Sequence, residues 1–106
     1  MVKDELKEKD IEKYLRDEIK KVGGIAYKFV SPGNAGVPDR LVLLPDGLMF
    51  FIELKAPGKK TRPIQDRQAG RIRRLGFKVE ILDSKNKVDY FIKFVKGLYN
   101  NGIHTT

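Results

Sequence analysis

The sequence has no cysteine and a single histidine among its 106 residues, and each scarcity excludes a kind of chemistry. Without cysteine there is no disulfide scaffold, no thiolate metal site and no cysteine nucleophile. One histidine, His104 near the C-terminus, cannot build a histidine-rich zinc site. No apolar run approaches the roughly 20 residues of a membrane span, and the mixed-charge N-terminus lacks the apolar stretch of a signal peptide. We therefore expect a cytoplasmic protein with no membrane partner.

Positive charge is in excess, and it is concentrated in one segment. Lys and Arg number 22 against 14 Asp and Glu, which gives a net charge of +8. Residues 55–78 hold nine of the basic residues and one acidic residue, so this segment carries the whole excess. A one-signed segment in a balanced domain favours a polyanionic partner, most often nucleic acid. The alternative is a solvated basic helix without a specific partner.

The pattern of apolar and turn residues predicts one α/β domain, a mixed sheet flanked by helices. The length leaves no room for two ordinary domains, so residues 1–106 are expected to form a single domain with its core over 4–98. Helices are expected at 4–22, 62–75 and 88–98. Strands are expected at 25–30, 40–44, 48–55 and 77–82. Pro45-Asp46-Gly47 predicts a hairpin turn between two strands that are apolar on both faces, so we expect this hairpin to be covered on both sides.

Two carboxylates stand out in this hairpin. Side chains alternate along a strand, so Glu53 interrupts the otherwise apolar strand 48–55. Counting back from the turn places Asp39 opposite about position 53, and Lys55 two residues further on shares the face of Glu53. Two close carboxylates repel each other, and a divalent cation such as Mg²⁺ would relieve this repulsion. The alternatives are a turn aspartate after proline and an ion pair at a strand end.

The expected helices offer further polar candidates. Glu12 lies at the edge of the first helix's apolar arc, and Glu18 also projects into it, so spacing does not choose between them. In the helix 62–75, Ile64, Ile72 and Leu75 mark the inward side, and Gln65 falls on that side as well. A buried Gln needs hydrogen-bond partners. Gln68 is its competitor, with a backbone-bonded amide at the core edge as the simpler interpretation.

Residues 12–92 together resemble the VRR-NUC domains of the PD-(D/E)XK nuclease superfamily, in the small stand-alone form of phages and bacteria. The combination and order of the motifs make the resemblance specific. It is carried by Lys28-Phe29, Ser31-Pro32-Gly33, Gly36-Val37-Pro38-Asp39-Arg40, Glu53-Leu54-Lys55-Ala56-Pro57-Gly58, Pro63, Gln65, Leu75-Gly76 and Val79.

The resemblance implies an αβββαβ core and a Mg²⁺- or Mn²⁺-dependent endonuclease for branched DNA, similar to Holliday-junction resolvases and active as a homodimer. By family analogy the metal ligands would be Asp39, Glu53, the Leu54 carbonyl and a helix carboxylate, taken as Glu12 with Glu18 in reserve. Lys55 would orient or activate the attacking water, and Gln65 would support the site.

The basic segment is expected to hold DNA phosphates without reading sequence. The candidates lie in the loop after residue 55 and on the helix that follows it: Lys59, Lys60, Arg62, Arg67, Arg71 and Arg74. The glycines of the loop 31–38 would allow close approach of the backbone to DNA.

Three other functions compete with the nuclease. The first is a catalytically inactive DNA-binding module of the same fold. The second, a sequence-specific restriction enzyme, is disfavoured because no base-reading element is evident. The third, an RNA-binding protein, is disfavoured because Phe50, Phe51, Phe77 and Phe91 fit a core better than an exposed stacking surface.

Overall fold

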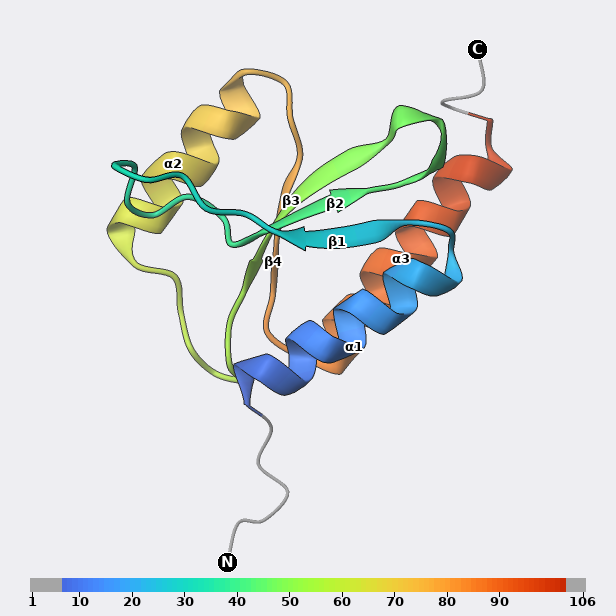
Figure 1. Ribbon diagram of the computed structural model, residues 1–106, viewed down its shortest axis with the longest axis horizontal. Helices are drawn as coiled ribbons and strands as arrows, with labels where there is room; N and C mark the ends of the chain where they lie inside the picture. The colour runs from blue at the N-terminus through green and yellow to red at the C-terminus, as the bar shows by residue number, and fades with distance from the viewer. Residues whose placement is uncertain (1–6, 103–106) are drawn as a thin grey trace, which may run out of the picture.

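The computed structural model describes residues 7–102, which form a four-stranded mixed sheet flanked by helices (Figure 1). The helices are α1 (Glu8–Lys21), α2 (Pro63–Arg74) and α3 (Lys85–Asn100). The strands are β1 (Ile25–Lys28), β2 (Arg40–Leu43), β3 (Met49–Leu54) and β4 (Val79–Leu82). The α/β class predicted from the sequence is confirmed. The predicted helix start at residue 4 and His104 lie outside the described residues.

The sheet has the strand order β1-β2-β3-β4. The first three strands are antiparallel neighbours, whereas β4 runs parallel to β3 after the crossover through α2. The turn between β2 and β3 is the short 3₁₀ segment η1 (Pro45–Gly47). In η1, Asp46 and Gly47 both adopt positive φ, at 64° and 79°. The hairpin predicted at Pro45-Asp46-Gly47 is therefore present, and the chain reverses direction within these residues.

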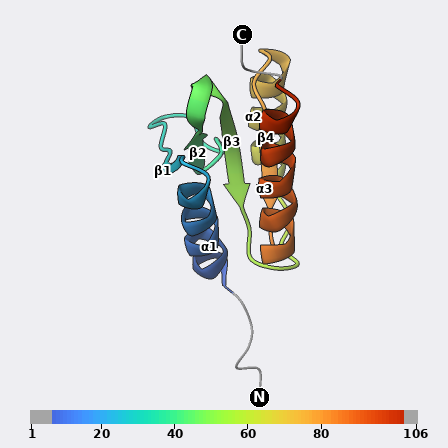
Figure 2. The same ribbon diagram turned by 90° about the vertical axis from the view of Figure 1, so that its right-hand side faces the viewer.

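Helices cover the two faces of the sheet unequally. In the edge-on view of Figure 1, α2 lies on one side and α1 and α3 lie on the other. Figure 2 shows α1 and α3 side by side over their face. Their buried side chains meet Val42, Phe50, Ile52 and Leu54 of the sheet in one apolar cluster. No helix among the described residues is long and apolar enough to cross a bilayer.

Helix α2 covers less of its face than the sequence predicts. Its buried residues are Gln65 and Ala69, while Leu75, expected to point inward, is 77% exposed. Phe77 is 45% exposed, so its assignment to the core is wrong. The helix lies over the end of the sheet that carries Glu53. In the chain after it, the Phe77 ring meets Phe51 edge-on and the Lys78 carbonyl accepts from the Phe51 N–H at 2.8 Å.

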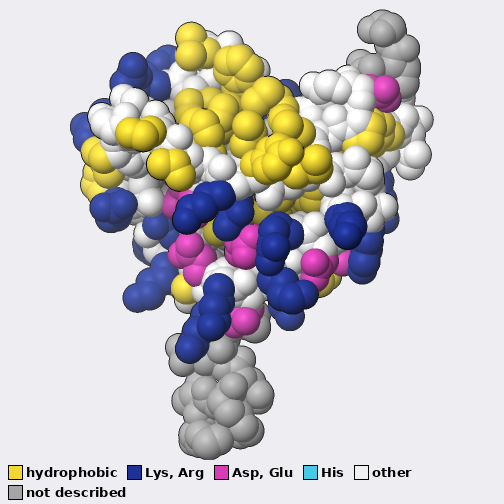
Figure 3. Space-filling view, in the orientation of Figure 1, with side chains coloured by type: hydrophobic (Ala, Val, Ile, Leu, Met, Phe, Trp, Pro, Cys, Tyr) yellow, Lys and Arg dark blue, Asp and Glu magenta, His cyan; other side chains and the backbone are white. Residues whose placement is uncertain are grey.

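The remainder of that sheet face is open and apolar. The register aligns Ile25, Leu43 and Met49 in one row and Tyr27, Leu41 and Phe51 in the next. Ile25 and Tyr27 are about half exposed, and Leu43 is also exposed. We call these six residues the open apolar face. Figure 3 shows hydrophobic side chains gathered between α2 and the turn that joins β2 to β3. The expectation that the hairpin is covered on both sides is therefore wrong on this side.

Candidate active site

Asp39 and Glu53 lie opposite each other where the β2–β3 ladder ends. Arg40 pairs with Ile52, so the next position beyond β2, Asp39, is opposite Glu53. A backbone hydrogen bond from the Phe29 N–H to the Asp39 carbonyl (2.8 Å) ties this position to the end of β1. Glu53 is 6% exposed and Asp39 is partly buried. The convergence expected from counting along the hairpin is present.

Pro38 changes the hydrogen bonding of this end of the sheet. The even-numbered residues of β2 and β3 form the hydrogen-bonded pairs of this ladder, as the bond from the Leu44 N–H to the Leu48 carbonyl shows. Leu54 would next pair with residue 38, but proline has no N–H to donate. The Leu54 N–H instead donates to Asp39 Oδ1 at 3.2 Å. The Leu54 carbonyl therefore receives no hydrogen bond from position 38, and it lies beside the carboxylates of Asp39 and Glu53.

Gln65 and Lys55 both contact one oxygen of Glu53. Gln65 Nε2 donates to Glu53 Oε2 at 2.8 Å, and Lys55 Nζ lies 3.5 Å from the same oxygen. The amide of Gln65 is oriented by a second bond, since its Oε1 accepts from the Arg62 N–H at the start of α2. The side chain thereby satisfies one of the free N–H groups near the helix terminus and presents its own N–H groups to Glu53. Lys55 is 14% exposed at its side chain, so its charge is also largely shielded from water.

Burial and neighbouring negative charge make the two carboxylates hard to ionise. Burial raises the pKa of Asp39 to about 6, although the Leu54 N–H opposes this shift. Burial, followed by the charge of Asp39, raises the pKa of Glu53 to about 7, while Lys55 opposes the rise. A cation bound between these groups would stabilise their charged forms. Two carboxylates and a free backbone carbonyl are oxygen ligands of the kind Mg²⁺ and Mn²⁺ accept, so these residues fit a divalent ion.

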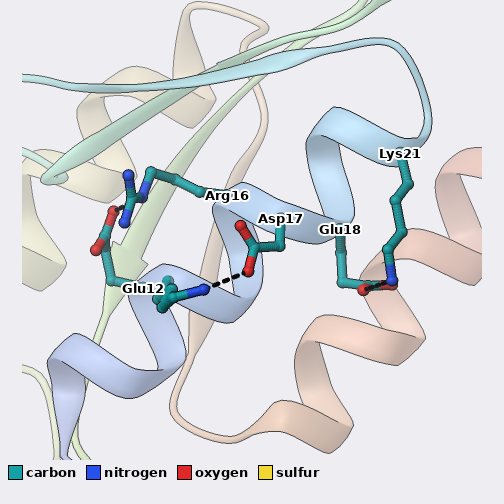
Figure 4. Close-up of polar contacts among 6 residues, drawn as sticks. Glu12, Arg16, Asp17, Glu18 and Lys21 are labelled. Atoms are coloured by element: carbon teal, nitrogen blue, oxygen red, sulfur yellow. Dashed lines mark hydrogen bonds and ion pairs between the residues drawn. The ribbon is translucent and has the colours of Figure 1, made fainter.

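The carboxylates of α1 are placed differently from the sequence expectation. Glu12 Oε2 forms ion pairs with Arg16 at 2.7 Å and with Arg40 at 3.2 Å (Figure 4 draws the first). Glu18 pairs with Lys21 further along the helix. The α1 charge that raises the pKa of both Asp39 and Glu53 is that of Glu8. In residues 7–102 no three Asp, Glu or His side chains are grouped closely enough to hold a metal.

Glu8 is an α1 carboxylate whose charge acts on the pair and which sequence reasoning did not single out. It lies four positions before Glu12, and residues four apart share a helix face. This spacing was the available signal, but the apolar pattern that defined the helix begins at Ile11 and gave no reason to examine the first turn.

The basic residues expected to bind DNA are exposed around α2. Lys59 and Lys60 lie in the loop after β3, Arg62 precedes the helix, and the arginines at positions 67, 71 and 74 are on its outer surface. Arg73 differs, because its Nη2 donates to the Val79 carbonyl at 2.7 Å. Within the basic segment, Lys55 contacts Glu53, and the exposed basic residues around α2 border the Asp39–Glu53 pair.

The loop 31–38 lies against α2. Gln68 Nε2 donates to the Ala35 carbonyl at 3.1 Å, which is the backbone-bonded role weighed for it from the sequence. Gly36, with φ 88°, passes so close to α2 that a Cβ there would lie 2.8 Å from the Ile64 carbonyl oxygen. The close approach that Gly36 permits is therefore to this helix.

Comparison with known proteins assigns the chain to a family. It is 56% identical over 81 residues to "Putative nuclease p44" of Acyrthosiphon pisum secondary endosymbiont phage 1, covering 76% of this chain and 87% of that protein. A solved VRR_NUC domain matches with a TM-score of 0.77 and 34% identity, over 81% of this chain and 94% of the other. The chain belongs to the VRR-NUC family. No family model matches the sequence. The two matches confirm the resemblance to VRR-NUC domains that the sequence motifs of this chain indicate.

Proposed function

We propose that this VRR-NUC protein is a divalent-metal-dependent endonuclease that hydrolyses phosphodiester bonds in branched DNA. The observation that carries the proposal is the convergence of Asp39, Glu53, the Leu54 carbonyl and Lys55 at one end of the sheet. The nuclease name of the phage relative supports the same activity. We expect it to act in the cytoplasm of a bacterial or phage-infected cell, where its DNA substrate would be found.

Asp39, Glu53 and the Leu54 carbonyl would hold Mg²⁺ or Mn²⁺. When bound, the ion would lower the pKa of a water molecule and offset charge on the phosphate. A carboxylate of α1 would complete the oxygen ligands. The family resemblance points to Glu12, but two arginines already bind its carboxylate, so we infer that Glu8 contributes in its place.

The remaining residues act on the water and the DNA. Lys55 Nζ lies beside the Glu53 carboxylate, where it would orient the attacking water and stabilise negative charge in a partly dry site. Gln65 would hold Glu53 in position through its own bond to the Arg62 N–H. The basic residues around α2 would bind backbone phosphates and supply affinity without sequence readout.

A second copy of the chain would cover the open apolar face. Its two rows contain no charged side chain, so they offer no contact to phosphates, but they can pack against the same rows of a second copy around a two-fold axis. Asp39 and Glu53 lie on the same side of the sheet as these rows. A homodimer would thus carry two active sites next to one interface, as cleavage of two strands of a four-way junction requires.

The activity is tested with linear, flap and four-way-junction DNA incubated with Mg²⁺, Mn²⁺ or EDTA. We expect product from the junction only with metal, and none from Asp39→Asn or Glu53→Gln, while both variants still bind DNA. Asp17→Asn is the matched control, because Asp17 is an exposed α1 carboxylate paired with Lys13. Metal-independent binding without any cleavage would favour the inactive DNA-binding module instead.

A further inference from the structure

A second group of cations lies across the sheet from α2, next to Asp39. Lys28 of β1 is directly opposite Arg40 of β2. The neighbouring pair, Phe29 and Asp39, is joined by a backbone hydrogen bond, so Lys28 and Arg40 occupy a non-hydrogen-bonded pair. Side chains are closest in such pairs, and like charges there repel each other. The fold thus holds two positive charges together at the end of the sheet.

One carboxylate, that of Glu12, pairs with the two arginines of this group. Glu12 Oε2 contacts Arg40 at 3.2 Å and Arg16 at 2.7 Å, and in residues 7–102 no ion pair involves Lys28 and no other involves Arg16 or Arg40. Arg40 is 18% exposed at its side chain; its ion pair with Glu12 is made at Nη2, and a guanidinium has five N–H donors in all. The three cations therefore retain an excess of positive charge and unused donors.

This group is linked to the acidic pair. Arg40 follows Asp39 in the chain, and its charge opposes the rise in the pKa of Asp39. Lys28 and Arg40 belong to the sheet face that packs against α1, whereas Asp39 and Glu53 belong to the α2 face. The basic loop and α2 border the acidic pair from one side, and these cations border it from the other.

We propose that Lys28, Arg40 and Arg16, grouped around Glu12, form a phosphate-binding site for the DNA backbone on the α1 side of the active site. The inference rests on the proposed action on DNA and adds a contact outside the basic segment 55–78. A phosphodiester group there would relieve the repulsion between Lys28 and Arg40 and use the free guanidinium donors. Glu12 is then a positioning residue that holds Arg40 beside Asp39.

The test measures binding of a fluorescent four-way junction in EDTA over a series of salt concentrations. Lys28 is exposed, so Lys28→Ala is expected to fold, and removal of the repulsion from Arg40 should leave its melting temperature equal or higher. We expect binding to weaken about three- to tenfold and the salt slope to fall by about one. Lys96→Ala is the matched control, since it removes the same charge from the exposed surface of α3 near its C-terminal end.

The outcomes separate this inference from the nuclease proposal. A Lys28→Ala salt slope equal to those of the wild type and Lys96→Ala would overturn the phosphate site, even where the wild type cleaves junctions with Mn²⁺. A reduced slope supports the phosphate site, even where no cleavage occurs and the nuclease proposal fails. In a cleaving protein, Lys28→Ala should raise KM and leave kcat close to that of the wild type.

Discussion

Gln65 connects the start of α2 to the carboxylate of Glu53. Its Oε1 accepts from the Arg62 N–H at 2.8 Å, and its Nε2 donates to Glu53 Oε2 at 2.8 Å. Because the first bond fixes the amide, the second can be made only with an acceptor, which favours an ionised Glu53. A single side chain therefore couples the stability of a helix to the charge state of the site.

Gln65→Ala should lose both bonds. We expect a loss of about 1–2 kcal/mol in the free energy of unfolding, measured by urea denaturation, from the lost helix-terminal bond and the unpaired Glu53. We also expect kcat for junction cleavage to fall with little change in DNA binding. Gln68→Ala is the control, since it loses one bond to the Ala35 carbonyl and does not touch Glu53. Equal effects of the two variants on kcat would contradict a role for Gln65 at the site.

The stability of the metal-free protein should fall as pH rises from about 4 to 7. The folded pKa values of about 6 for Asp39 and about 7 for Glu53 lie above the ordinary values near 4, so the folded state binds more protons in this window. Glu53→Gln removes the part of this penalty that comes from Glu53, while the part from Asp39 remains. We expect the variant to be more stable than the wild type by roughly 1–2 kcal/mol at about pH 8, with a gain that shrinks towards about pH 4.

This pH dependence is measured by urea unfolding in EDTA. Asp17→Asn should show no such gain, because the Lys13 ammonium lowers the pKa of Asp17. A Glu53→Gln curve parallel to the wild-type curve across the whole range would contradict the raised pKa of Glu53.

Glu8 and Glu12 should respond differently to neutralisation. Glu8→Gln removes the α1 charge that acts on Asp39 and Glu53, so we expect a weaker apparent affinity for Mn²⁺ in cleavage assays and a fall in rate of about tenfold or more. Glu12→Gln should instead change DNA binding, since it alters the ion pairs with Arg16 and Arg40. If Glu12→Gln alone changes the Mn²⁺ dependence, the family-based choice of Glu12 is correct.

Gly36 and Gly33 provide a matched pair in the loop before Asp39. Both have positive φ, at 88° and 82°, but only a Cβ at Gly36 would meet the Ile64 carbonyl. Gly33→Ala should cost about 1–2 kcal/mol of stability from backbone strain alone. Gly36→Ala should cost more and should also reduce cleavage, because the loop must move away from α2. Equal losses in urea denaturation would show that the contact with Ile64 is unimportant.

Tyr27→Glu tests the homodimer. A charge within the open apolar face cannot be buried against its own copy without a large penalty. We expect light scattering to report a dimer for the wild type and a monomer for Tyr27→Glu. Tyr90→Glu is the control, because Tyr90 is also an exposed tyrosine, at 72% against 53% for Tyr27, but lies on α3. A wild-type monomer, or a Tyr27→Glu dimer, would exclude this face as the interface.

The local geometry of the site follows from periodicities that the sequence displays. Alternation in β3 and the short turn at Pro45–Gly47 place Asp39 opposite Glu53, and the helical period turns Gln65 inward. The exposure of Leu75 could not be predicted in this way, because the period gives the direction of a side chain and not the extent of sheet beneath the helix. Glu12 was equally ambiguous, since its ion pair with Arg40 joins elements distant in sequence.

Pro38 has a consequence beyond shaping a turn. If residue 38 had an amide hydrogen, the antiparallel ladder of β2 and β3 would gain one more hydrogen-bonded pair. The Leu54 carbonyl oxygen would then accept a hydrogen bond within the sheet. Because proline has no N–H, the hydrogen-bond ladder ends one residue pair earlier, and the Leu54 carbonyl oxygen remains available to a metal ion. Pro38 thus contributes to the site by lacking an amide hydrogen. In a Pro38→Ala variant, the new N–H would bond to the Leu54 carbonyl, which would then no longer be free to bind the metal.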